Sequence, residues 1–415
     1  MSSFNKFEKK LAKFLSANQG LKNKIKYTYK VFFQTILKPK KKYVTPNSIN
    51  TIDSKSSAET FFGYYDKSPS NENNDLVIYQ ESNALTSKDV NHAKEVSIIL
   101  YDKVNNKKIH AFKSKAFNWQ QGTKLQWLSN DSFIFNDYDE DNDHYFSRLI
   151  STLDFSEKEV PHPVYETYKD KIYSIDFRRL SLLNNDYGYF QHKEEINLDS
   201  LNDGILEYNL ETSESKQLVS LKEITEFNKS DKFSKARHCI NHLMISPDGS
   251  DLMFIHRYYI SDRRFDRLLL VNVNTGELQE LVDEDMVSHC CWKSNDTIIG
   301  FFRYNGKDAF HELSFKNNEI KVNVLEELNN YSDGHPTFLN DKLLFDCYPN
   351  RTGMQSVFVF DYQKKRVDCI GKFYSPVKFF GVNRCDLHPR FSSNGNSIFI
   401  DSVHTGKREL YEIAI

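Results

Sequence analysis

The sequence of 415 residues has almost no net charge and lacks several signals of common partners. Its 55 Lys and Arg oppose 57 Asp and Glu, a formal net charge of −2, so we expect no nucleic-acid partner. The six cysteines show no metal-knuckle spacing, and we expect reduced structural thiols, as in a reducing compartment. An acidic loop at residues 137–143 lacks the glycine and the glutamate of an EF-hand, so it is expected to be an ordinary solvated loop.

Residues 1–43 also lack a membrane-spanning run. The apolar run Val31–Phe33 is far short of the roughly 20 residues that cross a bilayer, and no signal-peptide core follows the lysines. Instead, apolar residues recur at helical spacing among many lysines, which predicts a basic amphipathic helical extension, broken into two helices near Asn18–Gly20.

Such a helix suits a membrane surface, with its aromatic side chains in the interface and its lysines on anionic headgroups. We therefore predict that residues 1–42 bind a membrane surface and that the protein is cytoplasmic, peripheral at the inner face of the cell membrane. The alternative is a helix that docks on the rest of the chain or on a partner. The basic run at residues 38–43 would then be a linker or a patch that binds lipid headgroups, with nuclear targeting as a weaker option.

Residues 44–415 are built from one repeated unit. Its clearest copy, His238–Asn274, reads as a strand, a tight turn at Ser246–Gly249, a second strand, a polar loop and a third strand. Related phrases start at His289, His335 and His388, at spacings of roughly 46 to 53 residues, which is the length of a four-stranded propeller blade.

Three more degenerate copies raise the count to about seven. They lie at Tyr64–Pro69, at Lys124–Asp131 and, as the weakest match, at Ile175–Leu182 before the phrase YGYFQHK. We predict an all-β fold, a seven-bladed β-propeller. The last repeat has room for only three strands, so part of Val44–Ile52 is expected to close the ring as its missing outer strand.

Histidines recur at one position of the repeat. His242, His289, His335 and His388 each stand near the start of an inner strand. Inner strands of a propeller line its central channel, so the four side chains are expected to form a ring at one mouth of that channel. A single histidine there would be read as a structural residue, but four at one repeat position favour a functional site.

The loops after the second strand of each blade return to the same end. They carry arginines beside tyrosines and histidines, a set that suits an anionic, hydroxyl-rich ligand such as a uronic-acid or phosphate-bearing glycan, because guanidinium binds carboxylate bidentately. The residues predicted to bind this substrate are His289, Arg303, Tyr258, Arg351, His404 and Arg408.

Two sequence motifs also resemble those of a known protein family. HLMISPDG at His242–Gly249 and LHPRFS at Leu387–Ser392 resemble the repeats of TolB-like propellers and, among enzymes, are most similar to those of oligogalacturonate lyases. The resemblance covers about residues 60–415 at the level of the repeat. It implies a seven-bladed propeller that cleaves uronides by β-elimination, with a divalent metal such as Mn²⁺ held near the channel.

Carried over by position, the resemblance implies specific roles. His388 matches the family's metal ligand before a proline, and His335 is a further ligand. Asp386 stands where the family usually has a histidine, a departure that still leaves a set of donors suited to a divalent metal. His242 and Arg257 would be the base and the residue that neutralises the substrate carboxylate.

The phrase FFGYYDKSP at Phe61–Pro69 resembles propeller proteins associated with bacterial capsule and surface-polysaccharide synthesis. This resemblance implies a second function: a membrane-tethered noncatalytic or glycosyl-transfer component of capsular polysaccharide biosynthesis that binds an anionic glycan or a nucleotide-sugar. A propeller that only binds other proteins is a third possibility, and it would have an apolar or featureless channel mouth.

Overall fold

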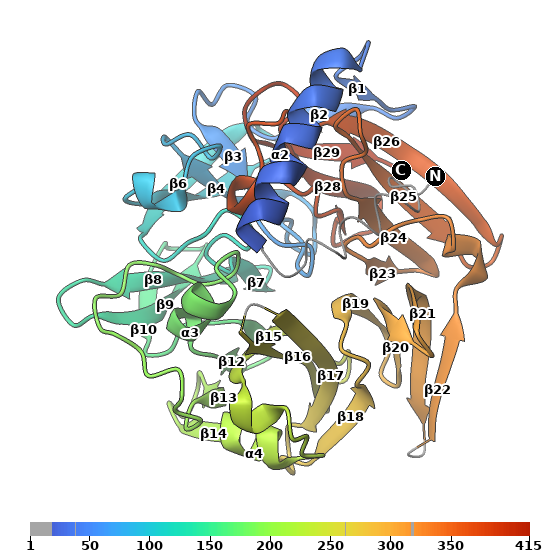
Figure 1. Ribbon diagram of the computed structural model, residues 1–415. Coiled ribbons are helices and arrows are strands. Elements are labelled where there is room, and N and C mark those ends of the chain that lie inside the picture. Colours follow the sequence, from blue (N-terminus) through green and yellow to red (C-terminus); the bar gives the residue numbers. More distant parts are fainter. Residues whose placement is uncertain (1–18, 38, 262, 317–318) are drawn as a thin grey trace.

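A computed structural model describes residues 19–37, 39–261, 263–316 and 319–415, and it forms a seven-bladed β-propeller. Figure 1 shows the seven sheets arranged in sequence order around a common centre. This arrangement confirms the predicted fold class. Every neighbouring pair of strands within the sheets is antiparallel.

The strands of the first three sheets are β3 (Glu59–Phe61), β4 (Leu76–Ser82), β5 (Val96–Asp102) and β6 (Lys107–Ser114); β7 (Gln126–Ser129), β8 (Ser132–Asp139), β9 (His144–Ser151) and β10 (Glu157–Val160); and β11 (Glu166–Tyr168), β12 (Lys171–Ser174), β13 (Gly204–Asn209) and β14 (Ser215–Ser220). The next two sheets contain β15 (Arg237–Ile245), β16 (Asp251–Ile260), β17 (Arg263–Asn272) and β18 (Leu278–Val282); and β19 (Val287–Ser294), β20 (Thr297–Tyr304), β21 (Lys307–Lys316) and β22 (Glu319–Val324).

The last two sheets combine the two ends of the chain. One contains β23 (Thr337–Leu339), β24 (Lys342–Cys347), β25 (Met354–Asp361), β26 (Arg366–Tyr374) and, as an added outer strand, β1 (Tyr43–Val44). The other contains β27 (Arg390–Phe391), β28 (Ser397–Ser402), β29 (Glu409–Ala414) and, as its outer strand, β2 (Ile49–Thr51). The segment expected to supply a closing strand thus forms β2, which pairs with β29.

Several second strands carry apolar side chains on both faces because neighbouring sheets pack against each other. β24, with the sequence KLLFDC, buries Leu343, Leu344 and Phe345 completely. Sharp turns connect such strands. Gly249 closes the turn between β15 and β16 with φ +79°, and a Cβ there would lie 2.1 Å from the ring of Tyr168 in the preceding blade, so only glycine fits.

The weakest predicted repeat was misplaced. Residues around Ile175–Leu182 form helix α3 (Phe177–Leu183), and no strand follows it at YGYFQHK. Asp176 caps this helix by accepting a hydrogen bond from the backbone N–H of Arg178, so the segment begins a helix between β12 and β13. The inner strands of this blade are β11 and β12, which are too short to stand out in the sequence.

The remaining helices are short, apart from the one at the N-terminus. They are α4 (Leu221–Glu226) and the 3-10 helices Val90–His92, Phe233–Lys235, Glu326–Leu328 and Gly381–Asn383. Helix α2 (Gln19–Ile36) lies across one end of the propeller in Figure 1. It begins where the second N-terminal helix was predicted, whereas the first predicted helix lies outside the described residues. Within the described part of the chain, no helix is long and apolar enough to cross a membrane.

Candidate functional site

The four repeated histidines surround the side chain of Tyr64. The Tyr64 ring centroid lies 5.5, 6.5, 6.2 and 5.1 Å from those of His242, His289, His335 and His388. Neighbouring imidazoles are also close. The centroid distances are 5.3 Å from His242 to His289, 4.1 Å from His289 to His335 and 4.3 Å from His335 to His388. The predicted histidine ring therefore exists, and a tyrosine from the loop between β3 and β4 fills its centre.

His335 is held by a carboxylate. It precedes β23, and its Nδ1 lies 2.9 Å from Oδ1 of Asp346, which also accepts the backbone N–H of His335 at 2.8 Å. A proton on Nδ1 that is donated to Asp346 leaves a lone pair on Nε2, which is buried without a hydrogen-bond partner. Burial works to lower the pKa of His335, but the charge and hydrogen bond of Asp346 outweigh it and raise that pKa above its usual value.

His388 is oriented in the same way by a backbone carbonyl. It precedes β27 with φ +44°, a left-handed conformation that a non-glycine residue adopts only under constraint. Its Nδ1 lies 2.6 Å from the carbonyl oxygen of Gly63, so Nδ1–H donates and the buried Nε2 keeps its lone pair without a partner. Burial and then the neighbouring His335 hold the pKa of His388 well below its usual value, so the imidazole is neutral.

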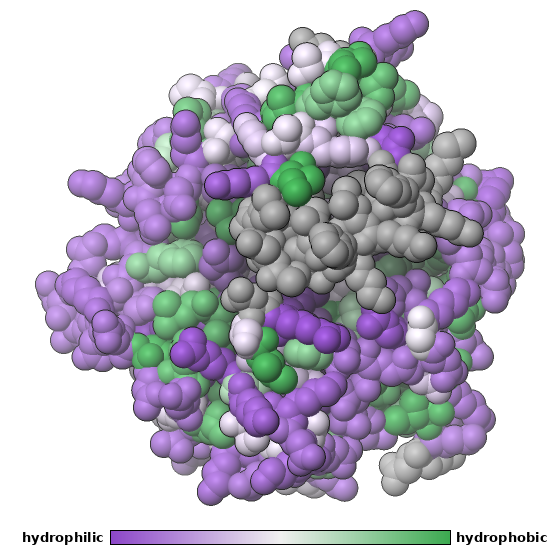
Figure 2. All heavy atoms as spheres, in the orientation of Figure 1, coloured by the Kyte–Doolittle hydropathy of each residue, from purple (hydrophilic) through white to green (hydrophobic). Residues whose placement is uncertain are grey.

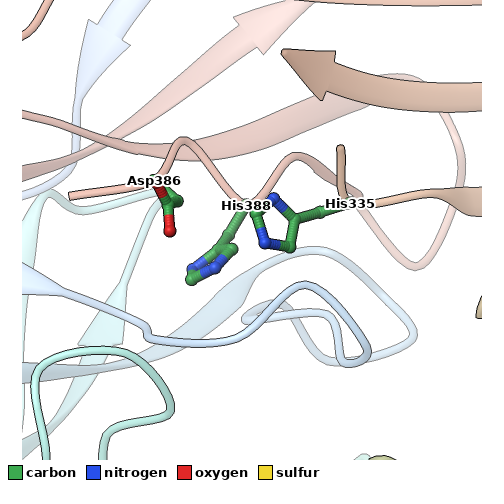
Figure 3. A group of neighbouring side chains, drawn as sticks. All are labelled: His335, Asp386 and His388. Atoms are coloured by element: carbon green, nitrogen blue, oxygen red, sulfur yellow. The ribbon is translucent and has the colours of Figure 1, made fainter. Parts of the chain in front are cut away.

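Asp386 completes a set of three donors. Ligand atoms of His335, Asp386 and His388 lie within 4.8 Å of one another, and all three residues are buried (Figure 3). Burial works to raise the pKa of Asp386, but the charge of Arg384, whose Nε donates to Oδ2 at 2.7 Å, and that of His335 lower it below its usual value. Two imidazole lone pairs and an ionised carboxylate therefore fit a divalent transition metal.

His242 faces the same centre from β15, at a register shift in the pairing with β16. Its φ is +56°, its Nε2 forms a short hydrogen bond with the Tyr64 hydroxyl, and its Nδ1 is buried without a partner. Burial, then His289 and then Arg257 lower the pKa of His242 well below its usual value. Arg257 is thus within electrostatic reach of His242, although its Nε is held by Asp266 at 2.5 Å.

His289, in β19, has a carboxylate partner of its own. Its Nδ1 lies 3.4 Å from Oδ1 of Asp333 and 3.0 Å from the hydroxyl of Ser288, which itself donates to Asp333 at 2.6 Å. Burial and His335 lower the pKa of His289, with Asp333 acting in the opposite direction. Of the residues predicted to bind substrate, His289 is the one that the structure brings into the ring.

The loop that carries Tyr64 is fixed to the last blade by a buried ion pair. Asp401, on β28, accepts hydrogen bonds from the backbone N–H groups of Phe62 and Gly63 at 3.0 Å each and pairs with Nη2 of Arg390 at 2.9 Å. Nη1 of Arg390 donates to the carbonyl of His388 at 2.6 Å. A Cβ at Gly63, where φ is +115°, would lie 2.8 Å from backbone atoms of Gln121, so this position requires glycine.

Tyr258 and Arg303 have partners outside the histidine ring. Both were predicted on loops, but they lie within β16 and β20 because these strands are long. Tyr258 is buried in an aromatic cluster with Phe233 and Phe265, and Arg303 pairs with Asp308 at 2.7 Å on a half-exposed surface.

The other three predicted substrate-binding residues are engaged in packing. Arg408 is buried and donates to the hydroxyl of Thr86 and to the carbonyls of Trp119 and Arg384. His404 packs among aromatic rings, including that of Tyr411 at 4.7 Å. The Arg351 guanidinium lies 5.6 Å from the ring centroid of Phe33 in α2.

Four residues that the sequence analysis did not assign to the site contribute to it. Tyr64, Asp333 and Asp346 hold the histidines. Lys124 lies near Tyr64, with Nζ 5.6 Å from its ring centroid, 2.9 Å from Asp66 and 4.1 Å from the ring centroid of Tyr165. Burial lowers the pKa of Lys124, with Asp66 acting in the opposite direction. The sequence did offer one signal, an aspartate at position 346 within the otherwise apolar run KLLFDC.

The class of protein that this fold defines is the seven-bladed β-propeller with a histidine ring at one end of its channel. Among solved structures, oligogalacturonate lyase from Vibrio parahaemolyticus is similar, with 13% identity, a TM-score of 0.55, and coverage of 91% of this chain and 99% of that one. An oligogalacturonate lyase in complex with manganese gives 12% identity, a TM-score of 0.55, and coverage of 91% and 98%.

The β-propeller domain of the Trilobed protease from Pyrococcus furiosus is also similar, with 11% identity, a TM-score of 0.50, and coverage of 86% of this chain and 94% of that one. No family model and no curated protein sequence matches this chain. At these identities, the likeness to solved structures establishes the fold.

Proposed function

We propose that this protein acts on an acidic glycan by metal-assisted β-elimination, in the manner of a uronide lyase, within bacterial surface or acidic polysaccharide metabolism. The observation that carries the proposal is the orientation of His335 and His388. Each has its Nδ1 hydrogen bonded to an acceptor and its buried Nε2 without a partner, and ligand atoms of the two imidazoles and of the Asp386 carboxylate lie within 4.8 Å of one another. The oligogalacturonate lyase solved with manganese has the same fold, which supports this choice of chemistry.

The three donors would hold a divalent, Mn²⁺-like metal, with Asp346 as the outer carboxylate that fixes His335. Such an ion, when bound, supplies positive charge that stabilises the uronate carboxylate as its α-proton leaves. His289 lies next to His335, with a ring-centroid distance of 4.1 Å, and contacts the sugar there.

His242 is the proton acceptor in this proposal. Its depressed pKa keeps the imidazole neutral at neutral pH, as a base requires. With its proton on Nε2 and directed to the Tyr64 oxygen, His242 presents the lone pair of the unpartnered Nδ1 to the substrate. Arg257 adds positive charge near the same point and favours a substrate carboxylate.

A second function is favoured by the burial of the site. The four ring histidines are each at most 5% exposed, and Tyr64 fills their centre, so the metal ligands are closed to a polymer in this structure. A noncatalytic or glycosyl-transfer component of capsular polysaccharide biosynthesis would use the same residues to hold an anionic glycan or nucleotide-sugar without eliminating it.

The experiment is an assay of the full chain, loaded with Mn²⁺, on a panel of oligouronides, with the absorbance of the unsaturated product as readout. We expect cleavage by the wild type, none after chelation, and none by the His242→Ala and His335→Ala variants. His92→Ala, an exposed histidine in a 3-10 helix, is the control that should retain activity. Uronide binding by calorimetry without any unsaturated product would reject the lyase in favour of the second function.

A further inference from the structure

Helix α2 packs on the end of the propeller where the metal ligands lie. The amide of Gln34 donates to the carbonyl of Ser375 at 3.3 Å and accepts from the hydroxyl of Tyr374 at 3.2 Å, and Tyr27 packs edge-on against Phe380 at 5.5 Å. Tyr374 is the last residue of β26, and Ser375 and Phe380 belong to the connection from β26 to β27, the segment that continues into Asp386. One face of α2 is therefore bound to the rim of the candidate site.

The opposite face of α2 is apolar and exposed. Ile25, Phe32 and Ile36 are spaced by seven and four residues, which places them on one side of a helix, about 180° from Gln34. Their exposed fractions are 38%, 57% and 60%, whereas Gln34 is 5% exposed. Figure 2 shows hydrophobic atoms gathered over the end of α2 nearest β1. A helix that docked only for stability would turn these side chains inward.

Basic residues surround this exposed face. Residues 19–52 contain eight lysines and no aspartate or glutamate. Lys24, on α2, and Lys40–Lys42, between α2 and β1, are exposed, and Tyr43 and Val44 of β1 are 44% and 51% exposed beside them. Apolar and aromatic side chains flanked by lysines match the interface of an anionic bilayer, where the chains enter the acyl boundary and the lysines meet headgroups.

We propose that this surface, defined by Ile25, Phe32, Ile36 and Lys40–Lys42, binds anionic lipid membranes and turns the histidine end of the channel toward the bilayer. The orientation follows from the packing of α2. Because its inner face contacts the histidine end of the channel, a membrane bound to its outer face lies next to that end. If the proposed glycan chemistry is right, on which this last step rests, the substrate is an acidic glycan held at the membrane surface.

The test is sedimentation of the full-length protein with vesicles of phosphatidylcholine alone or mixed with phosphatidylglycerol, without substrate. We expect binding to the anionic vesicles, weakened by salt. The double variant Phe32→Ser/Ile36→Ser should lose affinity by about tenfold or more, since it removes two exposed apolar side chains that would enter the bilayer interface. Replacing Lys40, Lys41 and Lys42 by Gln should lower affinity by at least about tenfold and flatten the salt dependence.

The matched control is Leu153→Ser. Leu153 is 77% exposed in the turn between β9 and β10, and in an antiparallel four-stranded blade this turn lies at the end opposite the connection from β26 to β27. The affinity of Leu153→Ser for vesicles should equal that of the wild type. Thermal unfolding of each variant checks that these exposed substitutions leave the fold intact.

Hydrogen exchange with and without vesicles tests the orientation. Protection should appear in α2 and in the segment around Gly381–Asn383, and not in the turn that contains Leu153. Binding that is equal on neutral and anionic vesicles, variants that bind as the wild type does, or protection at the turn would overturn the proposal. Failure to bind any vesicle would do so too, leaving a protein as the occupant of this face. None of these results depends on cleavage of soluble uronides, which tests the proposed function separately.

Discussion

Removal of the Asp401 carboxylate should destabilise the whole propeller. Asp401 and Arg390 are each 1% exposed and form a pair at 2.9 Å. In Asp401→Ala, the guanidinium stays buried without its counter-charge, and breaking a buried pair in this way costs about 3–5 kcal/mol. The backbone N–H groups of Phe62 and Gly63 also lose their acceptor.

The assay is urea unfolding followed by intrinsic fluorescence, with Asp368→Ala as control. Asp368 pairs with Arg366 at 2.8 Å, but these side chains are 48% and 64% exposed, so its loss should cost below about 1 kcal/mol. We expect Asp401→Ala to lower the free energy of unfolding by at least about 3 kcal/mol.

A second substitution separates unpaired charge from other causes. In the Asp401→Ala background, Arg390→Met removes the uncompensated guanidinium and should recover part of the lost stability. A loss in Asp401→Ala no larger than in the Asp368→Ala control would refute the conclusion that this pair holds the Tyr64 loop. Additive effects would also refute it. In that case Arg390→Met would lower the free energy of unfolding by as much in the Asp401→Ala background as it does in the wild type.

Three further predictions concern the site and its surroundings. Asp346→Asn should weaken metal binding by about 10- to 100-fold in a metal titration, because the carboxylate orients His335; unchanged affinity would contradict this role. Tyr64→Phe should lower kcat on uronides by about tenfold or more at unchanged metal content, since it removes the partner of His242; unaltered kcat would exclude Tyr64 from catalysis. Burial lowers the pKa of His404 from 6.5 to about 4, so the unfolded chain takes up a proton first as the pH falls. Stability should therefore decrease between pH 6.5 and pH 4 by about 3 kcal/mol more in the wild type than in His404→Phe, and equal pH profiles would show that His404 titrates normally.

The sequence was sufficient to predict the seven-bladed fold and the histidine ring because both depend on a repeated pattern, although it misplaced the repeat of the third blade. His242, His289, His335 and His388 recur at a fixed place in the repeat, and the repeat itself fixes which end of the channel they occupy. The proximity of Asp386 to His335 and His388 followed from the family resemblance, and the structure brings the three together within 4.8 Å.

The sequence did not predict which arginines reach the site, because the number of residues in a loop depends on where paired strands end. β16 and β17 pair as far as Ile260 and Arg263, so Arg257 and Tyr258 lie within a strand. Arg408 looked like an exposed ligand-binding residue, but it is buried by contacts with residues about 290 to 320 positions away, which no local pattern reveals. Tyr64, from the first blade, was not predicted in the histidine ring for the same reason: its contacts there are with residues far away in the sequence, such as His242.

The central claim is that His335, Asp386 and His388 hold a divalent metal, and metal content tests it most directly. Protein purified without chelator and supplied with Mn²⁺ would be measured by elemental analysis for the wild type, His335→Ala, His388→Ala and the exposed control His92→Ala. The account predicts one bound metal per chain in the wild type and in His92→Ala, and loss in both ring variants. Wild-type protein that binds no metal, or ring variants that retain it, would contradict the account.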